Sequence, residues 1–141
     1  MNKAAIIEGA KHSDLRGTLH FYNDVDLSPV KRFYISEHPD TEIVRAWQGH
    51  QRETKWFHVI SGKFKIALVR PDDWLNPRHD LSVEEFVLSE MNNQVLIIPG
   101  GYASGFKAID PGSRIMIFSD FSLAESQNDD FRFDKNIWYK W

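Results

Sequence analysis

The stretch Arg45-Ala46-Trp47-Gln48-Gly49-His50 decides how this sequence is interpreted. It places a guanidinium, an indole, an amide and an imidazole in one short segment of β-type composition. Because side chains alternate between the two faces of a strand, Gln48 and His50 are expected to point to the same side. Polar groups on the inward face of a barrel are costly unless a ligand or a polar partner satisfies them. The stretch therefore predicts the wall of a pocket inside a β-structure.

Composition excludes several classes of function. The chain has 141 residues, of which 42% are hydrophobic and 26% charged, and its net charge is −3. This is the balance of a globular domain with a core of its own, and there is no basic block that would indicate a nucleic-acid partner. The absence of cysteine excludes disulfides, thiol catalysis and cysteine-bound zinc. With neither a long apolar segment nor a secretory leader pattern, we expect a cytoplasmic protein that does not cross a membrane.

Most of the remaining sequence consists of short segments rich in β-branched and aromatic residues, separated by turn signals. These segments predict strands at Ala4–Ile7, Thr18–Tyr22, Lys31–Ser36, Glu42–Trp47, Lys55–Ile60, Lys63–Arg70, Val83–Leu88, Gln94–Ile98, Tyr102–Lys107 and Arg114–Asp120. No segment keeps helical periodicity over three turns, and only the tail after Leu123 has room for one short helix. The pattern predicts one all-β domain over residues 1–141, built as a sandwich or barrel.

Four segments carry a likeness to known proteins, and they occur in the same order. They are Asp14-Leu15-Arg16-Gly17, Arg45-Ala46-Trp47-Gln48-Gly49-His50, Lys55 with Gly62, and Ile98-Pro99-Gly100-Gly101-Tyr102-Ala103-Ser104-Gly105-Phe106. Together they resemble the motifs of the cupin family of nucleotide-sugar isomerases. That family includes dTDP-4-dehydrorhamnose 3,5-epimerase, dTDP-4-keto-6-deoxyglucose 3,4-ketoisomerase and the WxcM-like proteins, and the likeness is closest to the last subgroup.

The resemblance implies an RmlC-like fold, an antiparallel double-stranded β-helix (a cupin or jelly-roll barrel) with little helix. It implies a metal-independent epimerase or isomerase that moves a proton beside the ketone of a nucleotide-linked 4-keto-6-deoxysugar. The pathway would be deoxysugar or polysaccharide biosynthesis, the nucleotide dTDP, and no cofactor would be needed. A homodimer is also expected, in which the N-terminal strand and the aromatic tail Ile137–Trp141 cover edge strands across a two-fold axis.

Three positions depart from the motifs of the resembled family. Gln48 stands at the position of the catalytic histidine, Ser104 at that of a later histidine, and Met116 near that of the catalytic tyrosine. His50 is retained, as it is in the ketoisomerases. A second hypothesis therefore stays open, in which the protein is a catalytically silent cupin that binds a nucleotide sugar. A third is a purely structural cupin in a glycan-assembly complex.

Proton transfer beside a ketone needs a base that titrates near neutral pH and a group that stabilises the enolate oxygen. We expect His50 to be the base, with Lys55 or Arg45 polarising the carbonyl. The candidate substrate-binding residues are Arg16, Gln48, Trp47, Tyr34, Tyr102 and Ser104. Each of these side chains also has an ordinary structural interpretation, such as core packing for the tryptophan or ion pairing for the cations.

The sequence gives no support for a metal centre. The general cupin pattern uses a His-x-His pair with a following glutamate and a later histidine, and only His50 of that set is present. Ser104 occupies the late position. Because a tight transition-metal site needs three or four nitrogen, oxygen or sulfur ligands, no metal is expected here.

Overall fold

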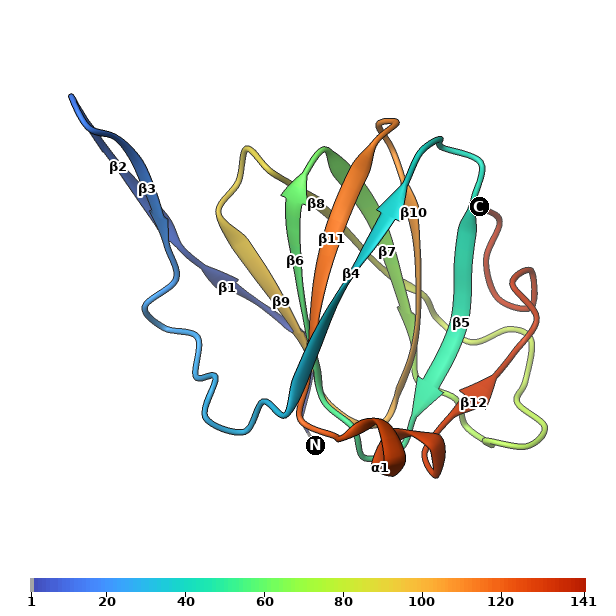
Figure 1. Cartoon of the computed structure of the whole chain (residues 1–141). Helices are drawn as coiled ribbons and strands as arrows, with labels where there is room; N and C mark the ends of the chain where they lie inside the picture. The colour runs from blue at the N-terminus through green and yellow to red at the C-terminus, as the bar shows by residue number, and fades with distance from the viewer. Residues whose placement is uncertain (1) are drawn as a thin grey trace.

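Two five-stranded antiparallel sheets face each other in the computed structural model, which describes residues 2–141 (Figure 1). The strands are β1 (Ala5–Glu8), β2 (Ala10–Asp14), β3 (Gly17–Phe21), β4 (Arg32–His38), β5 (Val44–His50), β6 (Lys55–Ser61), β7 (Lys63–Val69), β8 (Glu84–Ser89), β9 (Gln94–Ile98), β10 (Tyr102–Ala108), β11 (Ser113–Ser119) and β12 (Phe131–Arg132). The first sheet has the order β1-β9-β6-β11-β4 and the second β12-β5-β10-β7-β8. The predicted all-β jelly-roll class is confirmed.

All ten predicted strands are present, but β2 and β12 were missed. The sequence of β2 is polar and has no alternation, and β12 has only two residues, so neither carries a strand signal. The short helix after Leu123 is present as α1 (Leu123–Gln127). Its start is fixed by a capping box, in which Ser122 and Glu125 each accept a hydrogen bond from the other's backbone N–H.

The main core fills the space between the two sheets. On β7, Phe64, Ile66 and Leu68 point inward and are fully buried, as their two-residue spacing predicts. They pack in one cluster with Phe57 of β6 and Ile117 of β11. Each such side chain contributes about 1.5–3 kcal/mol by leaving water, so this cluster holds the sheets together.

A second apolar cluster covers the outer face of the second sheet. Trp47 and Val69 are each 1% exposed there, and the C-terminal segment lies over them. The Trp138 ring meets Trp47 edge-on at 5.2 Å between centroids, and its Nε1 donates to the carbonyl of Arg78 at 2.7 Å. The aromatic tail therefore packs on the second sheet of its own chain, and its expected part in a dimer stays a prediction.

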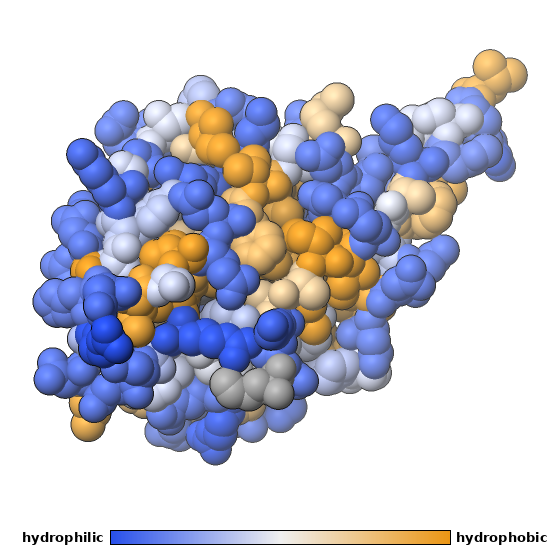
Figure 2. Space-filling model, turned by 180° about the vertical axis from the view of Figure 1, so that it is seen from behind, coloured by the Kyte–Doolittle hydropathy of each residue, from blue (hydrophilic) through white to orange (hydrophobic). Residues whose placement is uncertain are grey.

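The hairpin formed by β2 and β3 is an arm that projects clear of the two sheets, and it is visible in both whole-molecule views (Figures 1 and 2). Every residue of both strands is exposed. At its base the arm is tied to the body by His20, whose Nδ1 lies 2.6 Å from Asn93 Oδ1, and by the ring contact of Tyr22 with His58. Figure 2 also shows apolar side chains gathered across the middle of the face opposite that of Figure 1.

Within residues 2–141, no helix has the length and apolar character needed to cross a lipid bilayer.

The packing of the tail predicts a large effect of one substitution. Trp138→Ala removes the ring against Trp47 and should lower the free energy of unfolding by about 3–5 kcal/mol. Chemical denaturation monitored by circular dichroism measures this directly. Leu75→Ala, at a side chain that is 90% exposed, is the control and should change stability by less than about 0.5 kcal/mol. Equal stabilities of the two variants would contradict this account of the tail.

Candidate functional site

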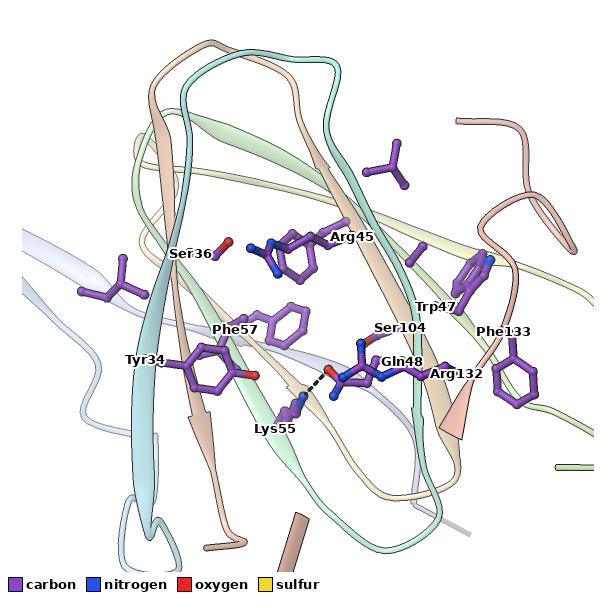
Figure 3. A pocket seen from close by; sticks show the side chains of 15 residues that line it. Tyr34, Ser36, Arg45, Trp47, Gln48, Lys55, Phe57, Ser104, Arg132 and Phe133 are labelled. Carbon is purple, nitrogen blue, oxygen red and sulfur yellow. Dashed lines mark hydrogen bonds between the residues drawn. The ribbon is translucent and has the colours of Figure 1, made fainter. Parts of the chain in front are cut away.

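A cavity of about 530 Å³ opens between the two sheets, with β4 and β5 as its two sides (Figure 3). Its apolar walls include Phe57, Phe106 and Ile117. Its polar lining residues are Tyr34, Ser36, Arg45, Gln48, Lys55, Ser104 and Arg132. A cavity in which several polar side chains converge between apolar walls is a usual form of a small-molecule site.

A bulge in β5 brings Arg45 and Gln48 to the same face. On the neighbouring strand β10, Ser104 pairs with Gln48 but Phe106 pairs with Arg45, so β5 has one extra residue in this interval. Gly105 lies inside the interval, and a Cβ there would come within 2.6 Å of Ala46 Cβ. Strict alternation separates positions 45 and 48, whereas the bulge directs both side chains into the cavity.

Lys55 is the most unusual group of the site. Its side chain comes from the start of β6 and is only 5% exposed, yet it lines the cavity. Its Nζ donates to Gln48 Oε1 at 3.0 Å and lies 4.0 Å from Glu53 Oε2. Burial lowers the pKa of Lys55 to about 8, although the Glu53 carboxylate acts in the opposite direction. The amine can therefore gain and lose a proton near physiological pH.

Glu53 is the buried counter-charge of this region. It is 1% exposed, and its Oε2 accepts a hydrogen bond from Ser119 Oγ at 2.8 Å and lies 3.6 Å from Arg32 Nη2. Its other oxygen, Oε1, is buried with no hydrogen-bond partner among residues 2–141. The loop that carries it is fixed by the Asp129 carboxylate, which accepts three backbone N–H bonds, from Gln51, Arg52 and Glu53.

His50 lies beside this network but is not one of the residues that line the cavity. It is 4% exposed, and its Nδ1 is 2.7 Å from the carbonyl oxygen of Asp129. A carbonyl only accepts, so Nδ1 carries the hydrogen and Nε2 keeps its lone pair. Burial and the neighbouring Lys55 lower the pKa of His50. Its expected role as base stays a prediction.

The strand β4 supplies a row of polar side chains that faces these groups. Tyr34 and Ser36 both point into the barrel (Figure 3), and Lys55 Nζ is 5.9 Å from the Tyr34 ring centroid. Burial raises the pKa of the Tyr34 phenol, which therefore stays protonated at neutral pH. The sequence analysis named Tyr34 but missed Ser36 and Arg132. Alternation along Lys31–Ser36 would have placed Ser36 on the same face as Tyr34.

Three predicted site residues lie elsewhere or face away. Arg16 is at the tip of the exposed arm, where its Nη2 is 2.6 Å from Asp14 Oδ2. Tyr102 is 2% exposed, and its hydroxyl accepts hydrogen bonds from Arg70 and from the Ala4 backbone. The Trp47 ring lies on the far side of β5 from Lys55 (Figure 3), in the cluster covered by the tail.

Met116 lies between the inward-facing Ile115 and Ile117, and is therefore on the outer face of β11. The phenol of the cavity comes from Tyr34 instead. No group of three or more histidine, aspartate or glutamate side chains in residues 2–141 is arranged to hold a metal ion.

No model of a known protein family matches the chain. The chain is 29% identical over 109 residues to the "Probable low-salt glycan biosynthesis epimerase Agl13" of Haloferax volcanii, a match that covers 77% of this chain and 68% of the relative.

Among solved structures, the chain is similar to dTDP-4-dehydrorhamnose 3,5-epimerase from Bacillus anthracis with TDP and PPi bound. The TM-score is 0.75, the identity is 21%, and the match covers 98% of this chain and 84% of that one. A variant of the 3,4-ketoisomerase QdtA from Thermoanaerobacterium thermosaccharolyticum in complex with TDP-4-keto-6-deoxyglucose gives a TM-score of 0.72. It shares 18% identity, over 94% of this chain and 89% of that one. The fold is thus the double-stranded β-helix of sugar-nucleotide epimerases and ketoisomerases.

The electrostatics of the cavity predict the effect of removing its counter-charge. Glu53→Gln deletes the negative charge near Lys55, and the pKa of Lys55 should then fall further below about 8. Titration of ¹³Cε-labelled lysine by NMR measures the value. Glu125→Gln, which removes the charge of the exposed pair with Lys31 and keeps an amide oxygen for the capping box, is the control. A Lys55 pKa that is unchanged in Glu53→Gln would show that this carboxylate does not set it.

Proposed function

We propose that this chain is an isomerase or epimerase that moves a proton beside the ketone of a nucleotide-linked 4-keto-6-deoxysugar, with no metal. The single observation that carries the proposal is the amine of Lys55, which lines the cavity between the two sheets and whose pKa is lowered by burial to about 8. The curated relative is named a probable epimerase of glycan biosynthesis, and the similar structures hold TDP or a TDP-linked 4-keto sugar. A dTDP-linked substrate and membership of the WxcM-like subgroup are part of the proposal.

The polar side chains of the cavity have separate roles in the proposed reaction. Burial lowers the pKa of Lys55 to about 8, so its neutral form can take a proton from the carbon beside the ketone. Tyr34, which stays protonated, can donate to the developing enolate oxygen. The Arg45 guanidinium forms no hydrogen bond or ion pair with another residue of 2–141 and is therefore available to an anionic diphosphate.

The proton-transfer role of Lys55 predicts a defined pH profile. Since only the unprotonated amine is a base, kcat/KM for dTDP-4-keto-6-deoxyglucose should rise with pH and level off above about pH 8. The groups that act on this amine are Glu53, Asp130, Arg32 and Arg132. Lys55→Arg keeps the positive charge but cannot lose it, and should reduce kcat by at least about 100-fold. Product formation followed by NMR gives both numbers.

The same experiment distinguishes this mechanism from an alternative in which His50 is the base. Near-normal turnover of Lys55→Arg, together with wild-type activity that falls above about pH 8, would mean that protonated Lys55 only polarises the carbonyl. The base would then be His50, and His50→Asn would abolish turnover. If Lys55 is the base, His50→Asn retains most of the activity because the His50 ring does not line the cavity.

One observation favours a catalytically silent binding protein as the second candidate. Gln48, at the position of the expected catalytic histidine, accepts the hydrogen bond of Lys55 through Oε1 and donates to Asp130 through Nε2. A protein of that kind would bind dTDP-4-keto-6-deoxyglucose, as measured by calorimetry, and form no product at any pH.

We also propose a homodimer with a cytoplasmic location. The outer face of the first sheet carries an apolar patch in which Phe33 and Ile35, 62% and 41% exposed, pair with Phe118 and Met116 of β11. The adjacent arm is a two-stranded hairpin with all its strand residues exposed, a structure that is marginally stable alone. A second copy of the chain that packs on this face would cover both.

The dimer has a direct test by light scattering after size exclusion. The wild-type protein at micromolar concentration should have twice the mass of the chain. Phe33→Asp places a charge at the centre of the apolar patch and should give a monomer with retained circular dichroism. Leu75→Asp, at an exposed side chain of another loop, should stay dimeric. A monomeric wild-type protein would refute the dimer.

A further inference from the structure

A buried imidazole behind the cavity has no role in the mechanism described so far. His38, the last residue of β4, is 1% exposed and lies against the rings of Phe64 and Phe106, at centroid distances of 5.1 and 5.6 Å. Its Nδ1 is buried and has no hydrogen-bond partner among residues 2–141. An unsatisfied polar atom costs about 1–3 kcal/mol, so this position would be more stable with an apolar side chain.

The other ring nitrogen has a partner on the cavity wall. His38 Nε2 lies 3.1 Å from Ser36 Oγ, and Ser36 is one of the residues that line the cavity. If Nδ1 carried the hydrogen, a buried N–H would be left without an acceptor, which is the rarest kind of unsatisfied group. The arrangement with the lower cost puts the hydrogen on Nε2, which then donates to Ser36 Oγ.

This assignment fixes the direction of the serine hydroxyl. With its oxygen already accepting from His38, the hydrogen of the Ser36 hydroxyl is free, and this hydroxyl makes no other hydrogen bond within residues 2–141. In Figure 3 the hydroxyl points into the barrel on the side of Arg45. We infer that Ser36, oriented by His38, is a hydrogen-bond donor of the site that binds an oxygen of the substrate sugar.

The inference rests on the proposed function and adds a residue to it. Along β4, Ser36 lies two residues from Tyr34, or about 7 Å, so the two donors reach different parts of a bound ring. Negative charge develops on the ketone oxygen when the neighbouring carbon loses its proton, and an oriented donor stabilises that charge. Burial and the nearby Arg45 lower the pKa of His38, which keeps the imidazole neutral. Ser36 is the group that contacts substrate, and His38 is its positioning residue.

Two pairs of variants test this role. Ser36→Ala removes the donor and should lower kcat for dTDP-4-keto-6-deoxyglucose by about 100-fold, with KM changed by less than about threefold, whereas Ser36→Thr keeps the hydroxyl and most of the activity. His38→Phe should lower kcat by about 10-fold while the melting temperature stays equal or rises, because the unsatisfied nitrogen is gone. His38→Gln retains an N–H donor and should restore part of the rate.

The outcomes separate the two proposals. Wild-type rates in Ser36→Ala, or equal losses in Ser36→Ala and Ser36→Thr, overturn the role of Ser36 and leave the proposed function intact. A wild-type protein that binds the sugar nucleotide without turnover overturns the proposed function. In that case the ¹⁵N resonance of His38 Nε2 should still shift when the sugar nucleotide is added and not when dTDP alone is added. No shift with either ligand overturns the inference by itself.

Discussion

The site depends on one buried charge pair, Lys55 with Glu53. An ammonium group that is nearly excluded from water is tolerated only because a carboxylate and the Gln48 amide are close to it. The carboxylate itself is held by Ser119 and Arg32, and its loop by Asp129. The balance between burial and this counter-charge sets the pKa of about 8, and with it the chemistry available to the cavity.

Tight apolar packing in the rest of the molecule explains why polar groups can occupy one part of the barrel. The apolar cluster around Phe64 and Ile66 holds the two sheets together, and the aromatic tail covers the second sheet from outside. The region around the cavity can therefore carry groups that destabilise the protein, including the unsatisfied nitrogens of His38 and His50. Departures from local stability of this kind are most often found where a protein binds or transforms a ligand.

Much of this arrangement could be predicted from sequence, because alternation of side chains is a local property. It places Phe64, Ile66 and Leu68 inward, and it identifies the strands that carry Arg45, Gln48 and Lys55. The bulge in β5 could not be predicted, since it arises from the pairing with β10 across Gly105. Ser36 and Arg132 do not belong to any of the four sequence motifs. The exposed position of Arg16 depends on the β2–β3 arm, which forms no part of the two sheets.

The central claim is that Lys55, in the wall of the cavity, removes a proton from a carbon beside the ketone of the substrate. Proton NMR of dTDP-4-keto-6-deoxyglucose with the protein in D₂O tests it most directly. We expect the signal of a carbon-bound proton adjacent to the ketone to disappear as deuterium replaces it, and the signal to persist with Lys55→Arg. A spectrum in which the ligand lines broaden on binding but no proton exchanges would contradict the claim.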